Sequence, residues 1–148
     1  MIAVDTNILV YAHRADAEWH AQAAAAVASL ANAAAPWAIP WPCVHEFFSV
    51  VTHARIFSRP TPRETACEQV DAWMESPSLV MLGEDADYWS ALRDAIVRGR
   101  VAGAMIHDAR IATLCRRHGV AELWTADRDF SRFAGLPARN PLTERGTK

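Results

Sequence analysis

Lysine is almost absent from this chain of 148 residues. Of its 15 lysine and arginine residues, only the terminal Lys148 is a lysine, so arginine supplies nearly all of the positive charge. The formal net charge of -2 gives the chain no overall positive field for attracting nucleic acid. This balance argues mildly against a protein that simply coats DNA.

Cysteines are few, and long apolar segments are missing. Cys43, Cys67 and Cys115 are odd in number and widely spaced, so they fit neither a disulfide framework nor a zinc knuckle. We expect them to be small buried thiols in a reducing cytosol. No apolar run approaches the roughly 20 residues of a membrane span. The first residues, Met1 to Asp5, also lack the basic start of a signal peptide. These absences predict a cytoplasmic protein without a membrane partner.

The residues that are present predict a single α/β domain. Apolar residues make up 51% of the chain, and charges of both signs are mixed, as in ordinary globular domains. Short apolar strands alternate with helical stretches, which predicts a central parallel sheet of four to five strands with helices on both faces. We assign residues 1–143 to this domain and expect 144–148 to be a frayed C-terminal tail.

The expected elements follow from apolar patterning and from the positions of proline and glycine. We expect strands near residues 2–4, 37–39, 79–82 and 122–125, and a short fifth strand near 138–140. We expect a helical turn at 8–13 and helices over 16–34, 42–57, 63–75, 85–98 and 103–119. Asp16 is the expected N-cap of the second of these segments, and Gly99 and Gly119 are expected to end the last two helices.

Four acidic side chains, far apart in the sequence, stand against apolar or helix-forming stretches. They are Asp5 in I-A-V-D-T-N, Glu46 in V-H-E-F-F, Asp108 in I-H-D-A and Asp127 in W-T-A-D-R-D-F. Burying an unpaired carboxylate is costly, and few positive side chains flank these four. A bound divalent metal ion is therefore the simplest compensating charge.

The topology predicts that these acids meet in one pocket. Ligands of open α/β sheets gather beyond the carboxyl ends of the strands. Asp5 directly follows the first expected strand, and Asp127 lies two residues beyond the fourth. Glu46 and Asp108 fall in the first turns of their helices, where the partial positive charge of the helix N-terminus favours an ionised acid.

Clustered carboxylates favour a hard divalent cation. Neighbouring acids raise one another's pKa, so four of them do not all ionise without a positive charge between them. Oxygen ligands suit Mg²⁺ or Mn²⁺, and the His and Cys spacings of zinc sites are absent. One or two such ions would activate a water for attack on phosphorus, with no nucleophilic Ser or Cys required.

Each acid also has an ordinary structural interpretation. Asp5 can cap the following helix, and Glu46 can be a first-turn helix acid. Asp108 can be a solvated helix residue, and Asp127 and Asp129 can be turn residues. The metal-site hypothesis depends on all of them occurring together at the correct ends of the strands.

The motifs D-T-N at Asp5, H-E-F at Glu46, H-D-A-R-I-A at Asp108 and T-A-D-R-D-F at Asp127 resemble those of the PIN-domain nucleases. In particular, the chain looks like the VapC-type toxin ribonucleases of bacterial toxin–antitoxin pairs. The likeness extends from Asp5 to Pro141. The segments W-P-C-V-H-E-F-F-S-V-V-T-H and D-R-D-F-S-R-F-A-G-L are specific to one branch of that family.

The resemblance implies roles for particular residues. Asp5, Glu46, Asp108 and Asp127 match the four acidic positions of the PIN site, and Asp5 and Asp108 would be the principal Mg²⁺ ligands. Asn7 and Thr125 match the polar positions that orient the acids, and Asp129 matches a more variable fifth acid.

The resemblance also implies an activity and partners. The activity is Mg²⁺-dependent endonucleolytic cleavage of RNA, and the partners are a cognate antitoxin that covers the site and a second copy of the chain. Trp41-Pro42-Cys43 departs from the family pattern, in which a small hydroxyl residue is frequent near the start of the Glu46 helix.

Three other functions remain as alternatives. A dehalogenase-like phosphatase requires a second Asp two residues after its nucleophile, where this chain has Asn7. A phospho-receiver domain requires a lysine at a late strand end, and the only lysine is Lys148. A non-catalytic scaffold does not require the four intact acids. Arg128, inside D-R-D, is as well explained by exposure to solvent as by contact with a substrate.

The helix that carries Glu46 has an apolar stripe at helical spacing. Its members are Val44, Phe47, Phe48 and Val51. We expect the stripe to pack in the core, with an edge available for a dimer or an antitoxin helix.

Overall fold

The computed structural model of the chain describes residues 1–143, which form one five-stranded sheet and its flanking helices. The strands are β1 (Ile2–Val4), β2 (Trp37–Pro40), β3 (Leu79–Leu82), β4 (Glu122–Trp124) and β5 (Ala138–Arg139). The helices are α1 (Thr6–His13), α2 (His20–Asn32), α3 (Trp41–Val51), α4 (Arg63–Met74), α5 (Tyr88–Gly99) and α6 (Met105–Arg117), and a 3-10 helix, η1, spans Arg128–Arg132.

All neighbouring strands of the sheet are parallel, in the order β3-β2-β1-β4-β5. Parallel strands with both faces covered read as continuous apolar runs, and every residue of β2 is buried. The predicted α/β architecture with a parallel sheet is therefore confirmed.

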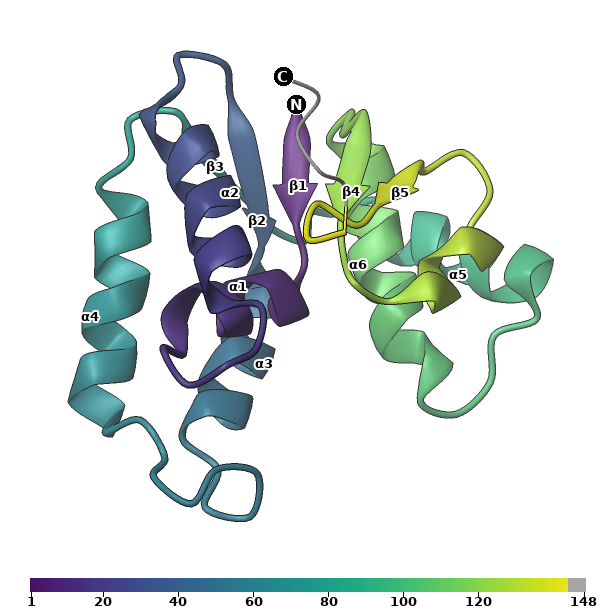
Figure 1. Ribbon diagram of the computed structural model, residues 1–148. Helices are drawn as coiled ribbons and strands as arrows, with labels where there is room; N and C mark the ends of the chain where they lie inside the picture. Colours follow the sequence, from purple (N-terminus) through teal and green to yellow (C-terminus); the bar gives the residue numbers. More distant parts are fainter. Residues whose placement is uncertain (144–148) are drawn as a thin grey trace.

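Helices cover both faces of the sheet, as the connections between strands require. The chain runs outward from β1 to β2 and β3, and then crosses back to β4 on the other side of β1. Because such crossovers are right-handed, connections that run in opposite directions lie on opposite faces. Figure 1 shows the α1–α2 pair in front of the sheet and the α5–α6 pair behind it.

The strand order reverses between β1 and β4, where the chain leaves the sheet in opposite directions. Such a switch point opens a crevice at the carboxyl ends of the strands. Asp5 directly follows β1, and Asp127 follows β4 by three positions. A backbone hydrogen bond of 3.0 Å from Asp5 N to the Trp124 carbonyl fixes these two strand ends to each other.

The core lies on both sides of the central strands. Its largest fully buried side chains include Trp37, Phe47, Phe130, Ile8 and Leu9. Phe47 sits edge-on to Trp73, with ring centroids 4.8 Å apart, and so joins α3 to α4. The predicted apolar stripe of α3 is split, because Phe47 and Val51 are buried whereas Phe48 is 39% exposed.

Several predicted helix boundaries are wrong. The second helix begins at His20, and Trp19, with no side-chain cap, takes the N-cap position in place of Asp16. Asp16 instead forms an ion pair of 2.6 Å with Arg14. The helix that carries Glu46 ends at Val51, six residues before the predicted end, and begins without any side-chain cap.

Helix α5 ends at Gly99, as predicted, although Arg100, not a glycine, takes the left-handed conformation beyond it, with φ of 48°. One prediction about a single residue is wrong. Cys67 is exposed, whereas Cys43 and Cys115 are buried as expected. The predicted frayed tail, 144–148, lies outside the described residues, and the domain boundary at 143 stays a prediction.

Within residues 1–143, no helix combines the length and the apolar character that crossing a bilayer demands.

We expect Arg100→Gly to raise the free energy of unfolding by about 1 kcal/mol, because only glycine adopts a positive φ without a steric cost. Urea unfolding of the purified protein measures this change. The matched control is Gly119→Ala, at φ of 69° and with nothing within 4 Å of the added Cβ, which should lower stability by a similar amount. Stabilities equal to that of the unmodified protein would contradict the strain argument.

Candidate metal centre

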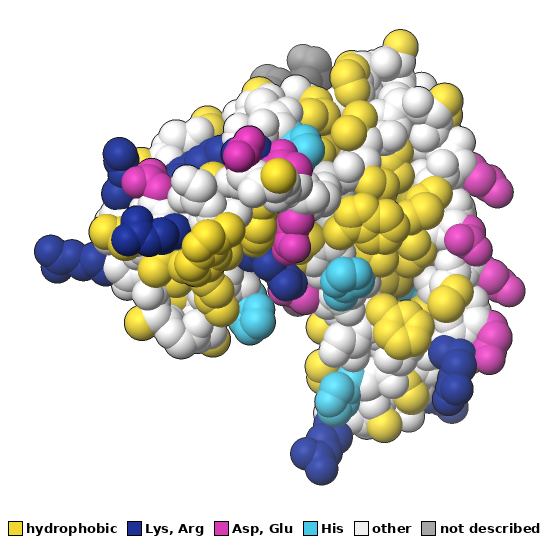
Figure 2. Space-filling model, turned by 180° about the vertical axis from the view of Figure 1, so that it is seen from behind, with side chains coloured by type: hydrophobic (Ala, Val, Ile, Leu, Met, Phe, Trp, Pro, Cys, Tyr) yellow, Lys and Arg dark blue, Asp and Glu magenta, His cyan; other side chains and the backbone are white. Residues whose placement is uncertain are grey.

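The four predicted acids converge on one cavity at the crevice between β1 and β4. Asp5, Glu46, Asp108 and Asp127 all line a cavity of about 390 Å³. Figure 2 shows the surface hollowed between two lobes, with acidic side chains inside the hollow. Among the described residues that line this cavity there is no arginine, lysine or histidine. The structure therefore concentrates negative charge in the lining of the cavity.

Asp5 is the most deeply buried of the acids, at 4% exposed. Its Oδ1 accepts a 2.7 Å hydrogen bond from Thr6 N and lies 3.7 Å from the Cys43 thiol. Its Oδ2 accepts hydrogen bonds from the Thr125 hydroxyl at 2.7 Å and from Asn7 Nδ2 at 3.0 Å. Asp5 is thus the N-cap of α1, as its structural interpretation proposed, and also a wall of the acidic cavity.

Burial raises the pKa of the Asp5 carboxyl to about 6, although hydrogen bonds from Thr125 and Thr6 act in the opposite direction. The negative charges of Glu46 and Asp108 raise this pKa further. Desolvation and like charge both disfavour the ionised form. A nearby cation would stabilise the ionised carboxylate and so oppose both effects. The pocket therefore electrostatically favours a positive ligand.

Asn7 and Thr125 connect the ends of β1 and β4 around Asp5. Asn7 donates to the Thr125 hydroxyl at 3.2 Å, and its Oδ1 accepts a 3.0 Å hydrogen bond from Ala126 N. The Thr125 hydroxyl also accepts a 3.0 Å hydrogen bond from Asp127 N. These hydrogen bonds connect Asp5 to Asp127, and the orienting role of Asn7 and Thr125 at a metal site stays a prediction.

Thr6 is a site residue that the sequence analysis missed. Its hydroxyl donates a 2.7 Å hydrogen bond to Glu46 Oε2 and so connects α1 to α3 across the cavity. The D-T-N motif contained the signal, because Thr6 stands between two residues that were assigned roles. Its partner is 40 positions away, and no local pattern indicates that contact.

The tightest group of acids that the structure assembles is Asp108, Asp127 and Asp129. One carboxylate oxygen from each lies within 4.8 Å of the others. Burial and the charges of Asp127, Glu46 and Asp129 raise the pKa of Asp108, and Arg132 opposes this rise. The Asp127 side chain also caps η1 by accepting a 2.8 Å hydrogen bond from Asp129 N.

The donor set fits a hard divalent cation. It consists of carboxylate and hydroxyl oxygens, which Mg²⁺ and Mn²⁺ prefer, and the buried Asp5 carries a charge that no side chain neutralises. The structure brings Asp129 into the closest group together with Asp108 and Asp127. The assignment of Asp5 and Asp108 as principal ligands stays a prediction.

One wall of the cavity depends on a buried arginine outside the acidic motifs. Phe57, from the loop after α3, lines the cavity, and the guanidinium of Arg14 lies 4.0 Å from the centre of its ring. Arg14 is 9% exposed and binds Asp16 through two nitrogens, at 2.8 and 2.6 Å. It also donates to the Arg59 carbonyl at 2.8 Å. Arg14 thereby fixes the loop that carries Phe57.

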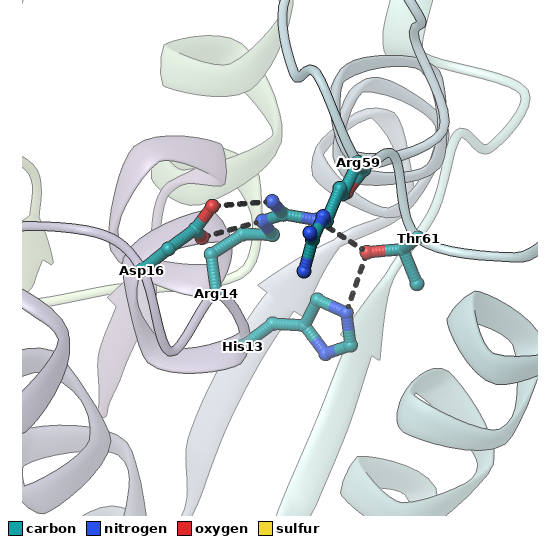
Figure 3. A network of polar contacts seen from close by, with 5 residues as sticks. All are labelled: His13, Arg14, Asp16, Arg59 and Thr61. Carbon is teal, nitrogen blue, oxygen red and sulfur yellow. Dashed lines mark hydrogen bonds and ion pairs between the residues drawn. The ribbon is translucent and has the colours of Figure 1, made fainter.

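Figure 3 shows Arg14 between Asp16 and Thr61, with His13 bonded to the same Thr61 hydroxyl. The Thr61 hydroxyl lies 3.3 Å from Arg14 Nη1 and 3.1 Å from His13 Nε2. His13 Nδ1 lies 3.0 Å from Gln69 Oε1, which only accepts, so Nδ1 donates this hydrogen bond. The network ties the end of α1 to the loop between α3 and α4 and to α4 itself.

A family model described as the PIN domain matches residues 2–136 of the chain. The chain is also similar to Ribonuclease VapC43 of Mycobacterium tuberculosis, with 37% identity over 142 residues, which cover 96% of each chain.

Solved structures with the same fold have lower sequence identity. A toxin of Mycobacterium tuberculosis, VapC20, described as cleaving the sarcin-ricin loop, aligns with a TM-score of 0.68 at 19% identity, over 92% of this chain and 96% of its own. VapBC2 of Rickettsia felis, bound to a DNA fragment from its promoter, aligns with a TM-score of 0.64 at 21% identity, over 95% and 98% of the two chains. These likenesses establish the fold.

We expect Asp5→Asn to stabilise the metal-free protein by about 1–3 kcal/mol above pH 6.5. The folded-state pKa of about 6 exceeds the unfolded value of 3.8, so ionisation of Asp5 weakens the fold as pH rises between them. Well below pH 3.8 the carboxyl is neutral in both states and the advantage should vanish. Urea unfolding with a chelator across pH 2.5–7.5 measures the difference. A gap that stays constant with pH would contradict the burial argument.

We expect Arg14→Met to lower the free energy of unfolding by about 2 kcal/mol, because it removes the hydrogen bonds to the Arg59 carbonyl and to the buried Thr61 hydroxyl and leaves that carbonyl without its donor. The matched control is Arg98→Met, which breaks an exposed ion pair with Asp94 and should cost less than about 0.5 kcal/mol. Equal losses in the two variants would show that the Arg14 network adds nothing beyond a surface pair.

Proposed function

The chain belongs to the PIN-domain family and, within it, to the VapC group, and from this premise we propose that it is a divalent-metal-dependent endoribonuclease. We further propose that it acts as the toxin of a toxin–antitoxin pair. The 37% identity to a relative named as a ribonuclease, over nearly the full length of both chains, supports the RNA substrate. Solved VapBC complexes with the same fold support an antitoxin partner.

The observation that carries the proposal is the convergence of four carboxylates on a single cavity, with no positive side chain among the described residues that line it. A structural role for each acid does not require this convergence. Asp5 and Asp127 each have a capping hydrogen bond that a turn alone would explain. A bound cation would explain why the caps of two different elements and two helix acids face one space.

We assign the cation to Asp108, Asp127 and Asp5, with Asp129 at the solvent side. The bound Mg²⁺, or Mn²⁺ in its place, would activate a water and stabilise the leaving oxygen of the phosphodiester. Asn7 and Thr125 fix the orientation of the Asp5 carboxylate by donating hydrogen bonds to its Oδ2.

We assign to Glu46 the role of orienting the attacking water. Its Oε2 is held by Thr6, and Oε1 has no hydrogen-bond partner in the described part of the chain. A carboxylate fixed at one oxygen and available at the other can orient a water and accept its proton. Thr6 is then a positioning residue for Glu46.

The proposed partners have a candidate surface on the lobe formed by α3 and α4. An apolar groove of about 430 Å³ runs between these helices and is lined by Val44, His45, Phe48, Cys67, Val70 and Asp71. The exposed face of Phe48 and the groove give an amphipathic helix a place to lay its apolar side. We propose this lobe for contact with the antitoxin or with a second copy of the chain. Action on RNA beside an antitoxin would place the protein in the cytoplasm.

We expect Asp108→Asn to reduce RNA cleavage by about 100-fold or more, because removing a ligand loses the charge stabilisation of the metal. Purified protein is incubated with a mixed cellular RNA pool and Mg²⁺, and the products are counted by end-mapping. The matched control is Asp94→Asn, which removes an exposed acid on α5 and should leave the products unchanged.

A chelator should abolish the products of the unmodified protein, and Mn²⁺ should restore them. Full activity in Asp108→Asn would refute the site assignment. Products that persist in chelator would refute the metal dependence and leave the nuclease activity standing.

A further inference from the structure

A second cavity adjoins the acidic one on the far side of Asp127. Its volume is about 440 Å³, and we call it the β4–β5 cavity because it lies beyond the carboxyl ends of these strands. Its lining residues are Thr125, Ala126, Asp127, Arg128, Ser131, Ala138, Arg139, Asn140 and Thr143. Asp127 lines both cavities, so a ligand that bridges them must pass over its carboxylate.

The two cavities have opposite electrostatic character. Among the residues that the structure describes, four carboxylates and no cation line the acidic cavity, whereas Arg128 and Arg139 line the β4–β5 cavity and Asp127 is its only acid. The acidic cavity repels a polyanion unless metal is bound. Arg128 and Arg139, in the cavity that shares Asp127 with it, are therefore well placed to hold a phosphate beside the reacting one.

Backbone and side-chain contacts hold the β4–β5 cavity in shape. Thr125 N donates a 2.9 Å hydrogen bond to the Arg139 carbonyl, which continues the pairing of β4 with β5 past the end of the strands. Asn140 Oδ1 accepts a 3.0 Å hydrogen bond from Leu142 N and shapes the turn after β5. The Asp127 cap fixes the start of η1, which carries Arg128 and Ser131.

We propose that the β4–β5 cavity binds the sugar–phosphate unit of the nucleotide that neighbours the scissile phosphate in the RNA chain. This inference rests on the proposed endoribonuclease function and adds the path of the substrate. The RNA strand crosses Asp127, with one phosphodiester over the acidic cavity and the next unit in the β4–β5 cavity.

The lining chemistry selects the backbone of the nucleotide rather than its base. Two guanidinium groups suit a phosphate, and the hydroxyls of Ser131 and Thr143 with the Asn140 amide suit a ribose hydroxyl. No aromatic side chain lines the cavity, so a base has no surface on which to stack. The subsite should therefore position the strand without reading its sequence.

Arg128 is the residue that tests the subsite. It is exposed, whereas Arg139 lies 3.9 Å from Glu122 in an ion pair, so a change at Arg139 also alters the sheet edge. Arg128→Gln removes the charge, and Arg128→Lys keeps it. Arg93→Gln is the matched control, because it removes an exposed arginine from α5 and lines none of the cavities that adjoin Asp127.

The first experiment needs no catalysis. Adenosine 3′,5′-bisphosphate is titrated into the isotope-labelled full chain, and amide chemical shifts are recorded. We expect the largest shifts at Asp129, Ser131 and Asn140, with binding weakened at least several-fold in Arg128→Gln and unchanged in Arg93→Gln. Shifts confined to other surfaces, or equal affinities in the two variants, would overturn the subsite.

The second experiment uses the RNA target from the mapped pool. We expect Arg128→Gln to raise KM about tenfold with little change in kcat, because the lost contact lies away from the reacting atoms. The dependence of log(kcat/KM) on log[salt] should become shallower by about 0.7, as for one lost phosphate contact on a single strand. Arg128→Lys should restore the salt dependence. An unchanged KM and salt slope in Arg128→Gln would refute the proposal.

The two experiments separate this inference from the proposed function. Bisphosphate binding at the β4–β5 cavity, with no cleavage of any RNA, would refute the nuclease and keep the cavity as a nucleotide-binding site. Cleavage of RNA that is insensitive to Arg128→Gln would keep the nuclease and refute the subsite.

Discussion

The structure depends on a carboxylate that is buried where two parallel strands diverge. Asp5 sits at the end of β1, hydrogen-bonded to Thr6, Asn7 and Thr125, and its backbone amide is tied to β4. Four hydrogen bonds or close donors do not offset its desolvation, since its pKa still rises to about 6. The fold therefore keeps a carboxylate at the centre of its crevice whose ionised form is disfavoured, and the negative charges of the other acids disfavour it further. A bound ligand can offset the free-energy cost of burying this charge, and groups with a strongly shifted pKa are common at functional sites. We therefore attach function to this site.

The two sides of this crevice differ in charge. Acids line the cavity on the α1, α3 and α6 side, where we propose a bound cation, and arginines at the end of β5 and in η1 line the neighbouring cavity, where we propose a phosphate contact. Asp127 lines both cavities and caps η1, so the same residue connects the two sides.

On the opposite wall of the acidic cavity, Arg14 has a structural role. It is saturated by Asp16, the Arg59 carbonyl and Thr61, and it supports Phe57 rather than contacting the cavity itself.

Sequence reasoning succeeded where a residue's position is tied to the end of a strand. Asp5 and Asp127 were placed at one edge of the sheet because parallel strands share a polarity, and the strand order confirms that placement. It failed where a distant partner overrode a local preference. Asp16 has the composition of an N-cap, but Arg14 takes its carboxylate for an ion pair, and α2 starts four residues later without a side-chain cap. Thr6 was passed over because its partner, Glu46, lies on another helix.

The sequence by itself determined the alternation of strands and helices and the identity of the acids, because both follow from short-range patterning and from motifs a few residues long. Tertiary structure alone decided which acids are neighbours. It placed Asp129 within 4.8 Å of Asp108 and Asp127, and it put Arg128 and Arg139 around a cavity that shares Asp127 with the acids. Those distances arise from the twist of the sheet and the packing of α6 and η1 against it. Contacts between residues tens of positions apart are set by that packing and have no signature in local sequence.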